Sequence, residues 1–168
     1  LWQWICGMPE AVTAYCDVAR YHRIEVEDDA TLMTRYQNGA TGLFVTSTGE
    51  YPGTNRLEIA GDLGKLVLED GTLKWWKLKA SEREVRWHSD NSMPQMPCDY
   101  VEERFEDGGA QHRGILQNFT NAILHGDALL SPGADGLNEL TLSNAAYLSQ
   151  WTGNSRVELP LDSARFDA

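Results

Sequence analysis

The chain alternates hydrophobic and polar residues over its first two thirds, and this period of two predicts β-strands. Ala14 and Cys16 fall on one side of the first such segment, residues 10–21. Asn38-Gly39 separates two further segments and is a strong hairpin signal. The other expected strands are residues 27–37, 40–48, 55–61, 65–69, 72–78, 82–88 and 100–106, with a closing strand at 157–159.

The last third of the chain changes to the period of an α-helix. Ile115, Phe119 and Ile123 form one apolar stripe, which ends at Gly126, and a second stripe ends at Gly153. Strands followed by helices are typical of α+β proteins. We therefore predict an α+β fold with an open, predominantly antiparallel β-sheet and helices packed on one face, in two layers.

The organisation of the chain is expected to be simple, because no repeat, low-complexity tract or composition shift marks an internal boundary. We expect a single domain over residues 1–168. The chain opens on the apolar stretch Leu1-Trp2-Gln3-Trp4-Ile5, and Gly7 and then Pro9 follow, which is how a helix ends. The uncovered sheet face is expected to contact a second copy, sheet to sheet.

Composition excludes several classes of partner. The formal net charge of the 168 residues is −11 and no basic patch is present, which argues against nucleic acid and anionic membranes. No apolar run reaches membrane-spanning length. Three widely spaced cysteines without a CxxC pair fit neither a disulfide framework nor a zinc site, so a reducing, cytoplasmic location is expected.

The sequence carries no recognisable cofactor or nucleophile motif. G-x-G-x-x-G after a strand, the P-loop and G-x-S-x-G are all missing. We therefore assign no catalytic, cofactor-binding or metal-binding residue to this chain.

Several segments resemble the C-terminal domain of the Gfo/Idh/MocA oxidoreductases. Each is weak alone, but their order and spacing are fairly specific, and together they cover nearly the whole chain. They are EVEDDAT at residues 25–31, YQNGATG at 36–42, NRLEIAGDLGKL at 55–66, and the segments 112–126, 136–146 and VELP at 157–160.

This resemblance implies a substrate-binding and oligomerisation domain. Family members have an N-terminal Rossmann domain that binds NAD or NADP and carries a catalytic Lys in a Glu-Lys-Pro segment. They often place an Asp-x-x-x-His pair just before a helix that ends like residues 2–7. No position here matches the Lys or the pair. The chain alone is thus expected to bind no cofactor and to be inactive, and the intact enzyme to act on a sugar, polyol or related hydroxyl compound as a homodimer or homotetramer.

The Asn38-Gly39 hairpin suggests where substrate would bind. A two-residue loop pairs Gln37 with Ala40, which sets Glu27 opposite Glu50. Like charges directly opposite are destabilising, and two interpretations remain. These residues form a solvated hairpin end, or they form a pocket wall whose carboxylates bind hydroxyl groups. The same register puts Asp29 opposite Thr48, and Met33 opposite Phe44 on that face.

Two histidines are further candidates. His22 lies beside the acidic residues, and it is a surface side chain, a substrate contact or, on weak spacing with Glu25 or Asp28, a metal ligand. His112 falls on the apolar stripe with Ile115, where it is a core-edge side chain or a substrate contact. The candidate substrate-binding residues are His22, Glu27, Asp28, Asp29, Thr48, Glu50 and His112.

Aromatic and cationic residues on the later strands have structural explanations as well. Arg56 fits an ion pair across the sheet better than a substrate contact. Trp75, Trp76 and Trp87 would form a carbohydrate platform or an oligomer contact. A different class of function therefore also stays open: a free-standing, non-catalytic sheet domain that dimerises or binds carbohydrate.

Overall fold

The computed structural model describes residues 1–106 and 109–166, and the chain divides into two compact units. The terminal unit comprises Leu1–Pro52 and Leu129–Ala168, and the central unit comprises Gly53–Ala128. Each unit contains one four-stranded antiparallel sheet and helices. The α+β class is confirmed, with two open sheets in place of a single one.

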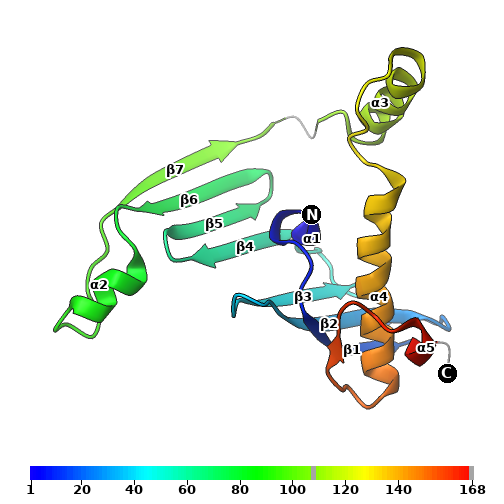
Figure 1. Cartoon of the computed structure of the whole chain (residues 1–168), viewed down its shortest axis with the longest axis horizontal. Coiled ribbons are helices and arrows are strands. Elements are labelled where there is room, and N and C mark those ends of the chain that lie inside the picture. Colours follow the sequence, from blue (N-terminus) through cyan, green and yellow to red (C-terminus); the bar gives the residue numbers. More distant parts are fainter. Residues whose placement is uncertain (107–108, 167–168) are drawn as a thin grey trace. The chain divides into compact units, whose positions relative to one another are not determined.

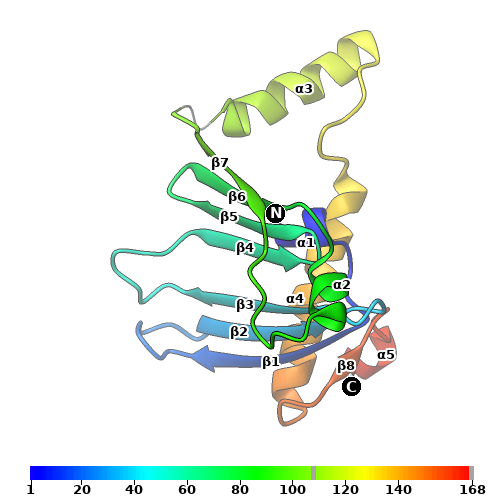
Figure 2. The same ribbon diagram turned by 90° about the vertical axis from the view of Figure 1, so that its left-hand side faces the viewer.

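The terminal unit is a two-layer structure in which helix α4 lies across one face of the sheet (Figures 1 and 2). The strands follow the order β3-β2-β1-β8. The elements of this unit are α1 (Trp2–Cys6), β1 (Ala11–Val18), β2 (Glu27–Arg35), β3 (Thr41–Ser47), the 3-10 turn η1 (Gly133–Asp135), α4 (Gly136–Trp151), β8 (Val157–Glu158) and α5 (Ser163–Phe166).

The core of this unit lies between α4 and the inner sheet face. Alternate residues of β1 face the helix, and Ala14 pairs with Leu32 of β2 on the same face. The alternation predicted for residues 10–21 is therefore correct. The buried core residues are Val12, Ala14, Cys16, Leu32, Leu142, Ala145, Ala146, Leu148 and Val157.

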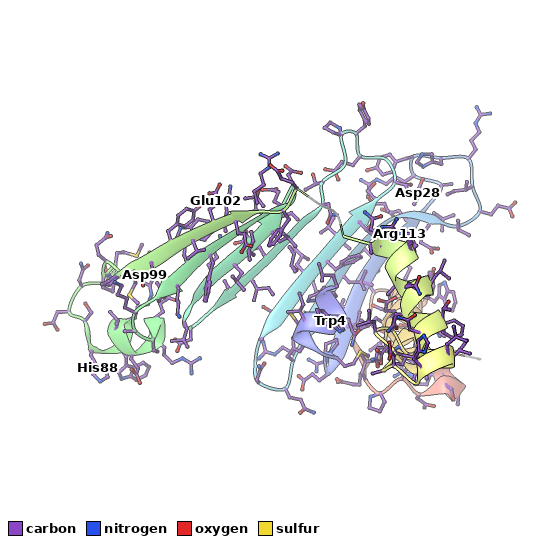
Figure 3. All side chains as sticks on the ribbon, turned by 90° about the horizontal axis from the view of Figure 1, so that it is seen from above. Trp4, Asp28, His88, Asp99, Glu102 and Arg113 are labelled. Carbon is purple, nitrogen blue, oxygen red and sulfur yellow. The ribbon has the colours of Figure 1, made fainter. Side chains whose placement is uncertain are left out.

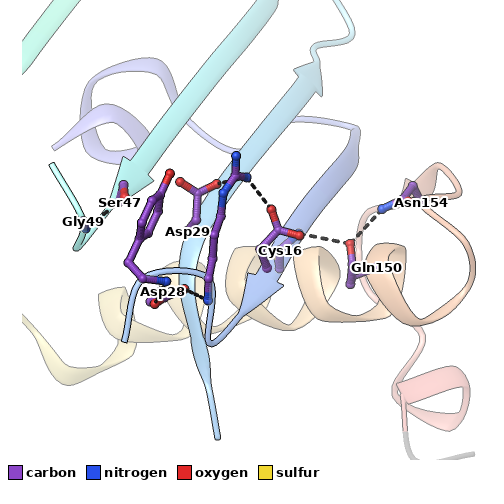
Figure 4. A network of polar contacts seen from close by, with 10 residues as sticks. Cys16, Asp28, Asp29, Ser47, Gly49, Gln150 and Asn154 are labelled. Carbon is purple, nitrogen blue, oxygen red and sulfur yellow. Dashed lines mark hydrogen bonds and ion pairs between the residues drawn. The ribbon is translucent and has the colours of Figure 1, made fainter. Parts of the chain in front are cut away.

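Side chains of α4 form hydrogen bonds to backbone groups of β1 that have no partner strand. The short strand β8 pairs only with Ala11 and Val12. Beyond it, the N–H of Ala14 donates to Ser149 Oγ at 2.9 Å, and the N–H of Cys16 donates to Gln150 Oε1 at 3.0 Å. Asn154 Nδ2 donates to the carbonyl of Ala14 at 2.8 Å. It also donates to Gln150 Oε1 at 2.8 Å (Figure 4). These side chains satisfy the backbone hydrogen-bonding groups of β1 that a neighbouring strand would otherwise satisfy.

The β2–β3 hairpin has a different register from the one predicted. Asp29 pairs with Ser47 and Leu32 with Phe44, so the partners are offset by one residue. Gly39 N–H donates to the carbonyl of Tyr36 at 2.9 Å, and Gly39 has φ 87°. This is a three-residue loop with Gly in the left-handed position, whereas a type I′ loop needs positive φ at both central residues.

The shifted register reverses the side-chain faces of β3. Phe44 lies on the inner face, where its ring stacks on Trp2 with centroids 6.0 Å apart. It does not share a face with Met33. Glu27 does not face Glu50, because β3 ends at Ser47 and Glu27 pairs with Val18 of β1. The predicted repulsion between these two carboxylates is therefore wrong.

The central unit contains a meander with the strand order β4-β5-β6-β7. Its ion pairs include Arg56 with Glu58 at 2.5 Å and with Glu69 at 3.0 Å, so the predicted structural role of Arg56 is confirmed. The elements of this unit are β4 (Arg56–Gly61), β5 (Gly64–Glu69), β6 (Thr72–Leu78), α2 (Glu82–His88), β7 (Cys98–Arg104) and α3 (Gln111–His125). Figure 3 marks His88 at the end of α2, and Asp99 and Glu102 on β7.

Residues 82–88 form a helix and not the strand predicted for them. Ser81 Oγ accepts the N–H of Glu84 at 3.1 Å, which is an N-cap bond. Arg86 also pairs with Glu82 one turn away. Trp87 lies on this helix and is 84% exposed, so it forms no row with the tryptophans of β6.

Helix α3 ends at Gly126 as predicted, but its apolar stripe is exposed. Ile115, Phe119 and Ile123 retain between 44% and 68% of their accessible surface. His112 is exposed as well, and its expected place on a buried stripe is wrong. In the part of the chain that the structure describes, no helix is both long and apolar enough to cross a bilayer.

Candidate functional site

The carboxylate of Asp28 organises the connection between β1 and β2. It accepts hydrogen bonds from the backbone N–H groups of Arg20 at 2.9 Å, Tyr21 at 2.8 Å and His22 at 2.8 Å. The His22 ring adds a contact, with Nδ1 3.2 Å from Asp28 Oδ2. Asp28 is 3% exposed, and its surroundings explain why a carboxylate is tolerated there.

The same contacts determine the ionisation of Asp28. Burial alone would raise its pKa, because it disfavours the charged form. The N–H groups of Tyr21, Arg20 and His22, together with the His22 ring, stabilise the carboxylate and lower the pKa to about 2. Asp28 therefore stays ionised at neutral pH, and its role is to hold the loop.

Thr48 closes this arrangement from the end of β3. Its N–H donates to the carbonyl of Asp28 at 2.9 Å, and its Oγ1 lies 3.2 Å from His22 Nδ1. The structure thus brings His22, Asp28 and Thr48 together. Their mutual hydrogen bonds give each of them a structural role beside any contact with substrate.

Glu27 points toward α4 because β2 carries a β-bulge at Asp28. Asp17 pairs with Asp29, but the next residue of β1, Val18, pairs with Glu27, so β2 holds one extra residue. The bulge turns Glu27 to the inner face, where Tyr147 of α4 donates its hydroxyl to the Glu27 carboxylate. The hydrogen bond to Glu27, then burial, raises the pKa of Tyr147 to about 12.

These residues line a cavity of about 410 Å³ between α1, strands β2 and β3, and the part of α4 from Glu139 to Tyr147. Trp2 and Phe44, whose rings are stacked, supply an aromatic wall. Its volume lies within the range typical of small-molecule sites. The other residues that line it are Leu1, Gln3, Cys16, Glu27, Asp28, Asp29, Ala30, Leu32, Thr46, Ser47, Thr48, Glu139, Leu142, Ser143, Ala146 and Tyr147.

Gly42 allows the aromatic wall to form. A Cβ atom at this position would lie 2.6 Å from Thr34 Oγ1 and 2.7 Å from the ring of Trp2. Both are closer than side chains tolerate, so only glycine lets Trp2 pack against β3. From the sequence this glycine would be interpreted as a strand bulge or a turn, but it pairs regularly with Thr34 inside β3.

The structure brings together most of the candidate residues. Glu27, Asp28, Asp29 and Thr48 all line the cavity. His22 does not line it but contacts Asp28 and Thr48. Glu50 lies beyond β3 and outside the lining, and His112 belongs to the central unit.

Sequence reasoning missed the contribution of α4 and α1. Tyr147 lies 120 residues from Glu27, and nothing local in the sequence connects them. Glu139 and Ser143 fall one helical turn apart on the same side of α4 as Tyr147, a spacing that could have suggested a polar stripe. Among the residues described, no group of three or more His, Cys, Asp or Glu is placed to hold a metal ion.

Part of the chain matches a known protein family. Residues 1–67 match the GFO/IDH/MocA C-terminal domain. The resemblance to that domain is confirmed. The matched Gfo/Idh/MocA segment carries α1, β1, β2 and β3, and thus every part of the cavity except the wall formed by α4.

Three solved structures with a similar fold are oxidoreductases. Levoglucosan dehydrogenase, solved with NADH and levoglucosan, aligns with a TM-score of 0.70 at 18% identity over 95% of this chain and 47% of its own. The aldose-aldose oxidoreductase from Caulobacter crescentus, complexed with glycerol, aligns with a TM-score of 0.66 at 22% identity. This alignment covers 94% of this chain and 43% of the oxidoreductase. The WlbA dehydrogenase from Bordetella pertussis, in complex with NADH and UDP-GlcNAcA, aligns with a TM-score of 0.57 at 24% identity. This alignment covers 95% of this chain and 41% of the dehydrogenase.

The chain spans less than half the length of each of these structures, and at these identities the likeness shows the fold. No curated protein matches the chain. The residues described do not fit a dinucleotide, because both sheets are antiparallel and offer no parallel strand–helix–strand unit with a phosphate-binding turn. We assign no NAD contact to them.

Proposed function

We propose that this chain is the substrate-binding and oligomerisation part of an NAD(P)-dependent oxidoreductase that acts on a sugar, polyol or related hydroxyl compound. The observation that carries the proposal is the cavity, which combines an aromatic wall with carboxylate and hydroxyl groups. Sites for small molecules are mostly apolar pockets with a few convergent polar groups.

The chemistry of the lining suits a polyhydroxylated ligand. Carboxylates accept strong hydrogen bonds from hydroxyl groups, and Glu27 and Glu139 stand on opposite walls, on β2 and α4. Ser47 and Ser143 both donate and accept. The faces of Trp2 and Phe44 offer apolar surface to the C–H groups of a sugar ring.

A second domain would complete the enzyme. The resemblance implies a Rossmann domain that binds NAD or NADP and an Asp-x-x-x-His pair immediately before α1. Leu1, Trp2 and Gln3 line the cavity, so a pair just ahead of them would stand at its rim. Residues 1–168 alone are expected to be folded, to bind no NAD(P)H and to be inactive.

Assembly would use the outer face of the terminal sheet, which α4 leaves open. Four large apolar side chains of this face are each about 60% exposed, namely Tyr15, Met33, Leu43 and Val45. A contiguous apolar patch of this kind commonly marks a protein interface. We expect a homodimer or homotetramer, and sedimentation of the chain as a monomer at high concentration would contradict this.

Ligand binding to residues 1–168 tests the role of the cavity. Saturation-transfer NMR with glucose as the probe is expected to show saturable binding that Tyr147→Phe and Glu27→Gln weaken. Glu103→Gln, which changes an exposed carboxylate on β7, is the matched control and should have no effect. Equal glucose binding by the parent chain and the three variants would contradict the assignment of the cavity as the substrate site. Micromolar affinity of the chain for NADH would contradict the proposal that the cofactor binds to a separate domain.

A further inference from the structure

We infer that the cavity accepts neutral or amino-substituted hydroxyl compounds and rejects sugar acids. This inference rests on the proposed function, because it takes the cavity to be the substrate site. It goes further by naming the charge of the substrate.

The lining carries acidic side chains and no basic one. Among the residues that the structure describes, four carboxylates line the cavity, and no Lys, Arg or His side chain does so. They come from the start of β2 and the first turn of α4, so they approach the ligand from opposite walls. The four are Glu27, Asp28, Asp29 and Glu139.

Two of these carboxylates have their charge compensated. Asp28 is occupied by three N–H groups and by the His22 ring. Asp29 Oδ1 lies 3.5 Å from Arg20 Nη1, but the same Nη1 is 2.6 Å from Asp17, so this guanidinium is shared between two acids. Arg20 therefore contributes little net positive charge to the cavity.

The other two carboxylates, Glu27 and Glu139, form no ion pair with a residue that the structure describes. Glu27 accepts the Tyr147 hydroxyl, a neutral donor. Within residues 1–106 and 109–166, no Lys, Arg or His nitrogen lies within 4.0 Å of either Glu27 or Glu139 in an ion pair. A ligand carboxylate or phosphate would lie near these negative charges without a cation to pair with it. Like charges brought together in a site are strongly unfavourable.

Hydroxyl and ammonium groups meet the opposite situation. A hydroxyl donates to a carboxylate in a charge-assisted hydrogen bond, and an ammonium adds a favourable charge. The cavity therefore discriminates by the charge of the substituent. For matched sugars we expect glucosamine to bind at least as tightly as glucose, and glucuronate at least about tenfold more weakly.

The test uses residues 1–168 with an acetylated amino terminus, so that a terminal ammonium at Leu1 adds no charge to the cavity. Isothermal titration and saturation-transfer NMR compare glucose, glucosamine and glucuronate at one pH and one moderate ionic strength. Glu139→Gln should narrow the gap between glucose and glucuronate, because it removes an uncompensated charge, whereas Glu103→Gln on β7 should leave the gap unchanged.

The outcomes separate the two claims. Binding of glucose with exclusion of glucuronate supports the charge selectivity. Glucuronate bound as tightly as glucose, or more tightly, overturns it while the proposed function stands. Saturable binding of none of the three sugars overturns the proposed function, and the selectivity with it.

Discussion

Tyr147 on α4 donates its hydroxyl to the carboxylate of Glu27 at the start of β2, across 120 residues of sequence. The contact fastens the helix to the strand next to the β-bulge, and both side chains line the cavity. It also couples the phenol to the stability of the fold, because ionisation of Tyr147 would break the bond.

The first prediction concerns alkaline pH. The pKa of Tyr147 is raised from 10.0 to about 12, so this phenol stabilises the fold fully below pH 10, and its contribution is lost as the pH rises through about 12. Phenolate absorbance should show one tyrosine that titrates near 12 and disappears in Tyr147→Phe. Glu27→Gln should bring that titration closer to 10. A Tyr147 that titrates near 10 in the unmodified chain would refute the contact.

The second prediction concerns the edge of β1. Ser149→Ala removes the acceptor for the Ala14 N–H and the donor to Ser155 O in a site that is fully buried. An unsatisfied buried polar group costs about 1–3 kcal/mol. Urea denaturation should show a loss of that size in the free energy of unfolding. Ser143→Ala, on an exposed position of the same helix, should change it by less than about 0.5 kcal/mol.

A third prediction follows from the ionisation of Asp28. Its pKa falls from 3.8 to about 2 on folding, so the stabilisation is complete above pH 3.8 and is lost as the pH falls toward about 2. Asp28→Asn should flatten this acid dependence of the unfolding free energy. It should also speed amide hydrogen exchange at Tyr21 and His22. Asp135→Asn, an exposed change in η1, should alter neither; an unchanged acid profile in Asp28→Asn would count against the loop-holding role.

The fourth prediction concerns the aromatic wall. Gly42→Ala places a Cβ 2.7 Å from the Trp2 ring, which must move. Overpacking of this kind typically costs about 1–3 kcal/mol, and glucose binding should weaken because Trp2 lines the cavity. Gly136→Ala meets nothing within 4 Å and serves as the control. Equal stability and equal glucose binding in the two variants would show that Trp2 does not depend on Gly42.

A strand can be predicted from the sequence where one of its faces is buried, as in β1, because a period of two records that burial. The hairpin register could not be predicted in this way. Asn38-Gly39 fits a two-residue loop and a three-residue loop, and the choice depends on φ, which is positive at Gly39 and not at Asn38. Because the loop has three residues, the register differs by one residue, and Phe44 lies on the face of β3 opposite to the one predicted.

The sequence of residues 82–88 carries signals of both a helix and a strand. Ser81 and Glu84 have the spacing of a capping box, and Glu82 and Arg86 are one turn apart. Val85 and Trp87 also alternate with polar residues, as in a strand. A segment of seven residues is too short for periodicity alone to decide between the two.

The sequence groups the cavity residues that come from the strands but not those that come from α4. Glu27, Asp28, Asp29 and Thr48 are close in sequence, so local reasoning could group them. Tyr147 meets Glu27 only because α4 packs over the sheet, and Glu27 reaches it only because the bulge reverses its direction. Both conditions depend on tertiary structure.

The β-bulge at Asp28 lies between a loop whose length can change and a strand segment whose length cannot. Ahead of it, residues 19–26 can lengthen or shorten without altering which side chains of β2 reach the core, because the count along the strand begins afresh after the bulge. A deletion of one residue between Asp29 and Arg35 would instead exchange the two faces of the strand. A change in the length of this loop therefore leaves the packing of α4 against the sheet unaltered, because that packing depends on the register of β2 after Asp28.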